Sequence, residues 1–338
     1  MTDMEERIAA YIAHRLPNAH GVAVDQLSRI PGGSSQETFK FRAVWDEGSG
    51  PADRWLILRR APPAGLVVAE RDVEFSVYDA IGDSDVPVPK VYFMEMDPQW
   101  LDRPFFVMDM APGKPGHFWT SDDPFEGQAQ AIGERFWRHL GALAAIDHRA
   151  VGLEDLRNGS GEPSLWAAEL GHWESILDEN ESMIDPVVRG AIRWLRANPP
   201  PPAAKQAIVH GDYRVGNFLF TPDGRISAVL DWEMCHIGDP LEDIAWALNP
   251  MWSVERWFPA EEGIALWEQA SGLSVDPAAL DWWRLFAAVK ACAIWTTAEA
   301  SFNSGRSRDM NVATTAVRGM SFHRKEILDH MAARGAIG

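Results

Sequence analysis

The sequence has few cysteines and no long apolar run, and both absences limit the kind of protein it encodes. Two of its 338 residues are cysteines, Cys235 and Cys292, which argues against a disulfide framework and fits a reducing compartment. No run of about 18 apolar residues occurs, so we expect no membrane-spanning helix and no membrane partner. The segment 1–7 is acidic and polar and lacks the apolar centre of a signal peptide. We therefore expect a cytoplasmic protein.

Basic residues are also scarce. The chain has 31 lysines and arginines against 49 aspartates and glutamates, a formal net charge of −18. Binding of a nucleic acid duplex depends on a basic surface, so we expect no nucleic acid partner. The pattern G-x-x-x-x-G-K-[ST] is absent, which excludes a P-loop kinase. Two thiols and scattered histidines give no zinc-ligand spacing.

Strand patterns in the first third of the chain are followed by helix patterns. The length of 338 residues and the hydrophobic content of 46% are enough for two lobes with sizeable cores. Apolar runs and alternation predict short strands at 38–45, 55–58, 90–96 and 104–110. Apolar residues at helical spacing predict helices at 129–147, 164–178, 186–197 and 282–297. We predict an α+β fold, with a small antiparallel-sheet N-lobe at 1–110 and a larger, mainly helical C-lobe at 111–338.

The most informative stretch lies in the second half of the chain. His-Gly-Asp-Tyr-Arg-Val-Gly-Asn occupies 210–217, and Asp-Trp-Glu occupies 231–233. Between them we predict a hairpin, with a Thr-Pro-Asp-Gly turn at 221–224 between two short apolar strands. Residues far from the turn on the two arms of a hairpin lie at the same end. We therefore expect Asn217 and Asp231 to converge, with Asp212 on the loop that enters that end.

These three side chains suit phosphate transfer. Magnesium prefers oxygen ligands, which Asn217 and Asp231 supply. Asp212 can then accept the proton of an attacking hydroxyl, a role worth roughly 10²- to 10⁴-fold in rate. Any one aspartate alone would more often be a polar loop residue, but the three together form the arrangement that kinases use around a transferring phosphate. His210 and Glu233 are candidate supporting residues beside them.

The motifs resemble those of the aminoglycoside phosphotransferase (APH) family, the phosphotransferase enzymes with a protein-kinase-like fold. Within this family the chain is similar to the branch linked to acyl-CoA dehydrogenases, through Leu-Arg-Arg at 58–60, Val-Pro-Val-Pro at 86–89 and Gly-Asp-Pro at 238–240. The resemblance runs from about residue 32 to about residue 243. It implies a bilobal kinase-like fold, ATP or GTP as co-substrate, and Mg²⁺.

The resemblance also implies a nucleotide site in the N-lobe. Kinases carry a phosphate-binding lysine at the end of the strand predicted at 55–58, and this chain has Arg59 there. Glu74 falls where the family carries the acidic partner of that cation, and Glu70, one helical turn earlier, is the competing candidate. Asp109 and Met110 resemble the hinge between lobes, whose backbone would bind the adenine.

A glycine-serine loop precedes the first strand that we predict. Its residues are Gly32, Gly33, Ser34 and Ser35. Backbone N–H groups in such a loop can surround phosphates, although the loop taken alone would more often be an ordinary hairpin connection. The loop does not match G-x-G-x-x-G. We include it in the nucleotide site because of the kinase motif further along the chain.

The acceptor remains open between several small molecules. The branch resemblance implies a kinase for the hydroxyl of a hydroxyacyl-CoA or hydroxy acid. The alternative is an aminoglycoside, macrolide or choline kinase, but only scattered carboxylates occur near the C-terminus, where a polycation would need a cluster. The 16 tryptophans could form an aromatic cage, yet most sit at helical spacing among apolar residues, as in a packed core. A non-catalytic nucleotide-binding protein is the third reading, favoured only by Arg59 in place of lysine.

Overall fold

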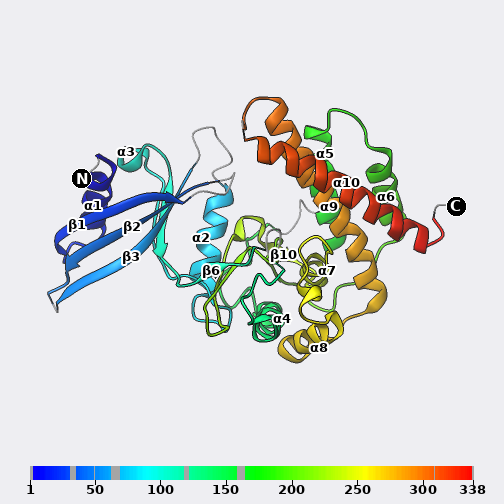
Figure 1. Cartoon of the computed structure of the whole chain (residues 1–338), viewed down its shortest axis with the longest axis horizontal. Helices are drawn as coiled ribbons and strands as arrows, with labels where there is room; N and C mark the ends of the chain where they lie inside the picture. Colours follow the sequence, from blue (N-terminus) through cyan, green and yellow to red (C-terminus); the bar gives the residue numbers. More distant parts are fainter. Residues whose placement is uncertain are drawn as a thin grey trace. The chain divides into compact units, whose positions relative to one another are not determined.

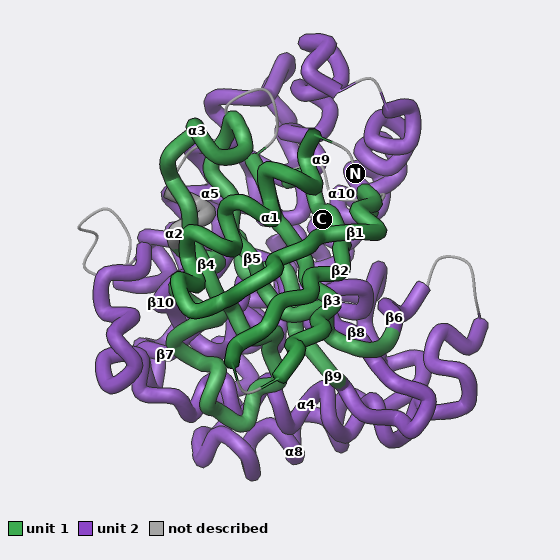
Figure 2. The backbone as a smooth tube through the Cα atoms, turned by 90° about the vertical axis from the view of Figure 1, so that its left-hand side faces the viewer, with its two compact units in different colours: residues 1–113, 227–233 green, residues 114–226, 234–338 purple. Residues whose placement is uncertain are grey.

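The computed structural model describes residues 3–30, 36–48, 50–61, 69–117, 122–157, 164–307 and 309–336. Contacts between Cα atoms divide the chain into two compact units, shown in green and purple in Figure 2. Unit 1 comprises residues 1–113 and 227–233, and unit 2 comprises residues 114–226 and 234–338. The division into a nucleotide lobe at 1–110 and an acceptor lobe at 111–338 stays a prediction about function.

Unit 1 is built on a five-stranded antiparallel sheet with the strand order β1-β2-β3-β5-β4. Strands β1, β2 and β3 of this sheet lie side by side in Figure 1. The strands are β1 His20–Ile30, β2 Glu37–Asp46, β3 Pro51–Arg60, β4 Val91–Glu95 and β5 Phe105–Asp109. The helices are α1 Asp3–Arg15, α2 Ala69–Ile81 and α3 Pro98–Leu101. The apolar patterns of the sequence did not predict β1 or the short helix α3. Asp97 caps α3 by accepting a hydrogen bond from the Gln99 N–H at 2.9 Å.

The two faces of the sheet carry different side chains, since successive residues of a strand point to opposite faces. Leu56 and Leu58 of β3 pack in one core with Ile8 and Tyr11 of α1. Arg59 therefore points to the other face. On β5 the same alternation gives Phe105 and Val107 to the first core and Phe106 to the second face.

Helix α2 packs on this second face. The rings of Phe75 and Tyr78 lie 6.0 Å and 6.3 Å from the ring of Phe106. One turn before Tyr78, Glu74 is fully buried. The packing thus brings an acidic side chain of α2 to the face of β3 that carries Arg59.

Unit 2 is mainly helical. Its helices are α4 Ala129–Ala145, α5 Leu165–Asn180, α6 Pro186–Ala197, α7 Leu241–Ala247, α8 Ala260–Ser271, α9 Pro277–Asn303 and α10 Met310–Ala333. Helices α8 and α10 were not predicted from the sequence. Helix α9 contacts α5, α6, α7 and α10, which explains why apolar residues occur on nearly all of its surface. Helix α9 extends beyond the predicted end at residue 297, to Asn303.

Short strands and turns of unit 2 carry the central motif. Its strands are β6 Lys114–Pro115, β7 Ala207–Val209, β8 Phe218–Phe220 and β10 His236–Gly238, and it contains the 3-10 helix Val254–Arg256. A second 3-10 helix, Trp232–Met234, begins in unit 1 and ends in unit 2. Strand β7 pairs antiparallel with β10, and β6 pairs with β8. The predicted turn after β8 is present, since Thr221 N–H donates to the Arg225 carbonyl at 2.9 Å. The chain then enters β9, Ile226–Val229, within which it passes to unit 1.

The structure confirms the predicted α+β class, with an antiparallel sheet followed by a mainly helical region. Among the residues that the structure describes, no helix is both long and apolar enough to cross a bilayer.

Candidate active site

Arg59 is the buried cation at the end of β3 in unit 1. Its Nη1 lies 3.1 Å from Oε1 of Glu74, and its Nη2 lies 3.3 Å from Oδ1 of Asp231. Gln36 links the first pair, because Arg59 Nε donates to Gln36 Oε1 at 3.2 Å and Gln36 Nε2 donates to Glu74 Oε2 at 2.9 Å. Of the two candidate partners, Glu74 contacts Arg59, and the side chain of Glu70 lies outside the described part of the chain.

The ion pair is withdrawn from water. The Glu74 side chain is fully buried and that of Arg59 is 11% exposed. Burial raises the pKa of the Glu74 carboxyl, and the charge of Arg59 opposes this rise. Burial alone would lower the pKa of Arg59, but the charges of Glu74 and Asp231 outweigh it and raise that pKa above its ordinary value. Arg59 therefore stays charged, and a rigid, permanently charged guanidinium is well suited to phosphate oxygens.

Asp231 has an unusual backbone conformation. Its φ of 72° lies in the left-handed region, which costs a non-glycine residue on the order of 1 kcal/mol. The Asp231 N–H donates to the hydroxyl of Tyr78 at 3.3 Å, and the Tyr78 ring packs against Trp232 with centroids 6.5 Å apart. The Asp231 side chain is 36% exposed. Tyr78 thus supports a turn that presents a carboxylate to solvent.

Asp212 lies on the loop after β7 in unit 2, and three side chains hydrogen-bond its carboxylate. Trp246 Nε1 donates to Oδ1 at 2.7 Å, and Arg214 Nε donates to the same oxygen at 2.9 Å. Asn217 Nδ2 donates to Oδ2 at 2.6 Å and to the Asp212 carbonyl at 2.9 Å. The Asp212 side chain is 12% exposed. These bonds fix the orientation of the carboxylate.

Asn217 and Asp231 have the donor atoms that magnesium prefers. The amide nitrogen of Asn217 is engaged by Asp212, so its amide oxygen is the atom that can coordinate a cation. Asp231 offers carboxylate oxygen on a partly exposed side chain. Hard oxygen donors of this kind fit Mg²⁺. The convergence of the two residues stays a prediction, since Asn217 belongs to unit 2 and Asp231 to unit 1.

The backbone before Asp212 is held by Asp243 of α7. Oδ2 of Asp243 accepts the His210 N–H at 2.7 Å, and Oδ1 accepts the Gly211 N–H at 3.0 Å. Burial raises the pKa of Asp243 to about 7, against the lowering effect of these two N–H groups. His210 is itself fully buried, and its Nδ1 accepts the Asp212 N–H at 3.1 Å. His210 therefore contacts the backbone of the loop; a supporting role at a metal stays a prediction.

Gly211 cannot be exchanged without strain. Its φ is 81°, and a Cβ atom at this position would lie 2.5 Å from the carbonyl oxygen of Met234. Such a distance is shorter than van der Waals contact allows, and the left-handed conformation favours glycine as well. The residue before Asp212 therefore has two independent reasons to be glycine.

A buried ionic network lies beneath the same loop. Lys290 of α9 donates to the Gly211 carbonyl at 2.6 Å and pairs with Oε1 of Glu242 at 2.8 Å. Oε2 of Glu242 lies 3.1 Å from Nε2 of His236, and Glu169 lies 3.5 Å from the same nitrogen. Burial alone would lower the pKa of His236, but the two carboxylates raise it. Charges from α5, α7 and α9 therefore meet behind the loop.

Three members of this network could geometrically hold a metal ion. The ligand atoms of Glu169, His236 and Glu242 lie within 4.8 Å of one another. However, Arg157 Nη2 lies 3.1 Å from Glu169, and Lys290 lies 2.8 Å from Glu242. Both carboxylates therefore already have a protein cation as counter-ion. We interpret the cluster as a structural brace for Gly211.

The remaining predicted residues belong to unit 1. The phosphate loop predicted at 32–35 lies outside the described residues. The N–H of Asp109 donates to the Lys90 carbonyl at 2.8 Å, and that of Met110 donates to the Trp55 carbonyl at 3.0 Å. An adenine beside these residues would have to use their carbonyl oxygens. Glu233 lies in the 3-10 helix Trp232–Met234 and adds a negative charge that helps raise the pKa of Arg59.

Sequence reasoning missed several residues that shape these clusters. They are Gln36, Tyr78, Arg214, Asp243, Trp246 and Lys290. For Lys290 a signal was present: it is one charge in an apolar segment of α9, and a charged residue in such a segment is almost never buried without a partner. The indole of Trp246 had no comparable signal.

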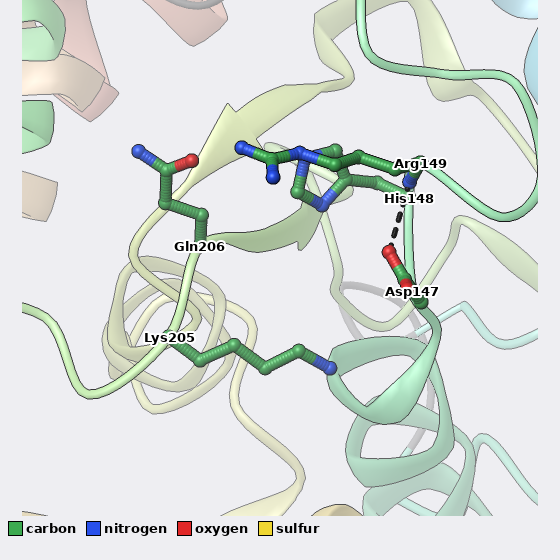
Figure 3. A pocket seen from close by; sticks show the side chains of 5 residues that line it. All are labelled: Asp147, His148, Arg149, Lys205 and Gln206. Atoms are coloured by element: carbon green, nitrogen blue, oxygen red, sulfur yellow. Dashed lines mark hydrogen bonds between the residues drawn. The ribbon is translucent and has the colours of Figure 1, made fainter.

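A hollow of about 520 Å³ on unit 2 contains none of the predicted site residues. It is lined by Asp147, His148, Arg149, Lys205 and Gln206 (Figure 3). The ammonium of Lys205 donates to the carbonyls of Ala144 and Ala145 at 2.9 Å and 2.8 Å, at the C-terminal end of α4. A cation at this end of a helix satisfies carbonyls that lack helical partners. The lysine of the hollow therefore has a structural explanation.

Comparison with known proteins shows the family. The model of the phosphotransferase enzyme family, APH, matches residues 26–285, which is most of the chain. The chain therefore belongs to the phosphotransferase enzyme family. It is a phosphotransferase of this family, whose substrate the match does not identify.

Two kinds of curated protein are similar to the chain. Acyl-CoA dehydrogenase family members 10 and 11 of Mus musculus are 27% identical over 240 residues and 25% identical over 293 residues. These matches cover 69% and 81% of this chain, but the chain spans only 21% and 36% of those two proteins. Viomycin phosphotransferase of Streptomyces vinaceus is 30% identical over 154 residues, 43% of this chain and 49% of that protein.

Solved structures show the same fold. A Ralstonia eutropha protein assigned as an aminoglycoside phosphotransferase has a TM-score of 0.76 and 22% identity, over 97% of this chain and 98% of that chain. Aminoglycoside phosphotransferase APH(4)-Ia, solved with AMP-PNP and hygromycin B, has a TM-score of 0.59 and 18% identity, over 96% of this chain and 98% of that chain. The kinase-like fold of the family is thus confirmed for this chain.

Proposed function

We propose that this phosphotransferase transfers the γ-phosphate of ATP to the hydroxyl of a hydroxyacyl-CoA or a related hydroxy acid, with Asp212 as general base. The assignment of Asp212 as general base is supported by its carboxylate, which accepts hydrogen bonds on both oxygens. The acceptor class rests on the similarity to acyl-CoA dehydrogenase family members 10 and 11. The chain spans a minor part of those proteins, so the acceptor is proposed from the segment that they share with this chain.

In the proposed reaction Asp212 orients the acceptor hydroxyl and takes its proton. The acceptor oxygen forms a bond to the γ-phosphorus as the bond to the β-phosphate oxygen breaks, and ADP leaves. Transfer of this kind depends mainly on alignment and on charge stabilisation. The bonds from Trp246, Arg214 and Asn217 support the role, because a carboxylate with a fixed orientation needs no reorganisation when the hydroxyl arrives.

Arg59 is proposed to bind phosphate oxygens of the nucleotide. The buried carboxylate of Glu74 and the amide of Gln36 hold its guanidinium. The N–H groups of the loop at 32–35 would add donors to the phosphates. The carbonyl oxygens of Asp109 and Met110 are proposed to contact the nucleotide base, which could belong to ATP or GTP.

Asn217 and Asp231 are proposed as ligands of Mg²⁺. Bound magnesium neutralises phosphate charge and orients the phosphates for in-line transfer. Asn217 contributes its amide oxygen, because Asp212 engages the nitrogen. Asp231 contributes a carboxylate on a turn supported by Tyr78. His210 and Glu233 are proposed to support these residues without touching the acceptor.

An antibiotic acceptor is the second candidate. The observation that favours it is the 30% identity to viomycin phosphotransferase over 154 residues. The same base and nucleotide residues would serve, and only the acceptor would differ.

The test measures magnesium-dependent ADP release with ATP and two panels of acceptors, hydroxyacyl-CoAs and aminoglycosides with viomycin. Asp212→Asn should lower turnover by roughly 10²-fold or more while ATP still binds. Asp147→Asn, an exposed aspartate of the hollow in the same unit, is the matched control and should keep full turnover. Release with hydroxyacyl-CoAs, lost in Asp212→Asn, supports the proposal. Release with antibiotics only would replace the acceptor class, and full turnover in Asp212→Asn would reject the base.

A further inference from the structure

The indole of Trp246 makes an unusual contact for a core tryptophan. Its Nε1 donates to Oδ1 of Asp212 at 2.7 Å, the shorter of the two bonds to that oxygen. Trp246 is 2% exposed and comes from α7, 34 residues further along the chain. An indole N–H is a donor only and carries no charge at any pH. It can therefore hold a carboxylate without supplying or taking a proton.

Two side chains lie against the ring of this indole. The ammonium of Lys290 lies 4.8 Å from the ring centroid, while the same ammonium donates to the Gly211 carbonyl at 2.6 Å. The ring of Trp252 lies 4.5 Å away, and its Nε1 donates to the Trp246 carbonyl at 2.7 Å. A ring enclosed in this way has little freedom to rotate. Its N–H therefore points at Asp212 in one direction only.

We propose that Trp246 is a positioning residue for the phosphate transfer, whose indole N–H holds the Asp212 carboxylate in the orientation that receives the acceptor proton. The inference rests on the proposed function, because it acts through Asp212. Arg214 donates to the same oxygen, but its side chain is 28% exposed, whereas Trp246 is 2% exposed. We therefore assign the positioning role to the indole of Trp246, which is buried and uncharged.

The first test compares Trp246→Phe with wild type. A hydrogen bond to a charged group that acts in the transition state should, when it is lost, lower kcat by roughly 10-fold or more. We expect kcat to fall by that amount while KM for ATP changes less than about twofold. A second variant replaces Trp246 with 3-benzothienylalanine, which keeps the shape of the indole and removes its N–H. It should show the same loss of kcat with nearly wild-type melting.

Trp283→Phe is the matched control. Its Nε1 donates to Oδ2 of Asp239 at 3.1 Å, so it is also a buried indole bound to an aspartate in unit 2. If Trp246 acted only through stability, the two phenylalanine variants would lose kcat equally. We expect Trp283→Phe to keep kcat within about threefold of wild type. The inference is overturned if the folded Trp246 variants keep wild-type kcat, or lose no more than Trp283→Phe does.

An NMR experiment tests the Trp246–Asp212 hydrogen bond separately from its effect on turnover. In a ¹⁵N-labelled protein, Asp212→Asn should shift the Trp246 indole N–H resonance and leave that of Trp283 unchanged. An unchanged Trp246 resonance would overturn the inference directly. Full turnover in Asp212→Asn would reject the proposed base and the inference together. Lost turnover in Asp212→Asn with wild-type kcat in the Trp246 variants would reject only the inference.

Discussion

The guanidinium of Arg59 lies 3.1 Å from the carboxylate of Glu74, and both side chains are nearly closed to solvent. The same guanidinium reaches Asp231, 172 residues further along the chain, at 3.3 Å. One buried cation thus joins strand β3, helix α2 and the turn before Trp232. Its removal should affect stability and nucleotide binding together.

Arg59→Met should destabilise unit 1 by about 3–5 kcal/mol, because it leaves Glu74 buried without a counter-ion. Arg59→Lys keeps the charge but loses the fork geometry, so the loss of stability should be smaller and KM for ATP should still rise. Thermal melting and ATP titration measure the two effects. The double variant Arg59→Met/Glu74→Leu should recover part of the lost stability. Equal melting temperatures for wild type and Arg59→Met would contradict the importance of the pair.

Gly211→Ala should be far more damaging than Gly272→Ala. Both glycines have positive φ, 81° and 72°, so each substitution carries about 1–2 kcal/mol of backbone strain. Only Gly211 has a close neighbour for the new Cβ, the Met234 carbonyl at 2.5 Å, and crowding should add a further ~1–3 kcal/mol. Urea unfolding of the two variants gives the difference. Equal losses would show that the loop relaxes around the methyl group.

Glu326 should make stability depend on pH. Its Oε2 accepts a hydrogen bond from Asn249 at 3.0 Å, and burial raises its pKa to about 7. The folded protein therefore holds this proton more tightly than the unfolded chain, whose glutamates titrate near 4.3. The contribution of Glu326 to stability should fall as pH rises from about 4.5 to about 7, by up to about 3 kcal/mol. The neighbours His323 and His330 act in the opposite direction over much of this range, because burial lowers the pKa of each to about 4 and an unfolded histidine titrates near 6.5.

Glu326→Gln is the variant that isolates this effect, because glutamine resembles the protonated acid at every pH. The stability difference between the variant and wild type should grow in favour of the variant as pH rises from 5 to 8. The exposed Glu179→Gln on α5 serves as control and should give a constant difference. Parallel curves for Glu326→Gln and wild type would mean that Glu326 stays charged in the fold.

Turnover should require magnesium and should respond to Asn217 and Asp231. EDTA should abolish ADP release, and excess Mg²⁺ should restore it. Asp231→Asn and Asn217→Ala should each raise the Mg²⁺ concentration for half-maximal turnover by roughly tenfold or more. Asp223→Asn, on the exposed turn between the two residues, is the control and should leave the titration unchanged. A wild-type magnesium titration in both variants would remove them from the proposed ligand set.

Much of the fold followed from local patterns. The strand residues at 38–45 and 104–110, the helix at 186–197 and the turn at 221–224 each depend on period, turn chemistry or capping within a few residues. The assignment of Arg59 to one sheet face also needed only the alternation of a strand. Four elements were missed, β1, α3, α8 and α10; of these, α3 is only the four residues Pro98–Leu101, too short to show a helical period.

The candidate site likewise has residues that the sequence predicts and contacts that it does not predict. The chain order and spacing of Asp212, Asn217 and Asp231 could be interpreted from the sequence, because the motif is short and its chemistry needs those residue types. The contacts of Trp246, Asp243 and Lys290 could not, since they join positions 32 to 79 residues apart. Such contacts depend on how α7 and α9 pack against the loop after β7, and no local period or turn preference encodes that approach. The sequence therefore names the proposed reacting groups, and long-range packing determines which buried donors and charges contact them.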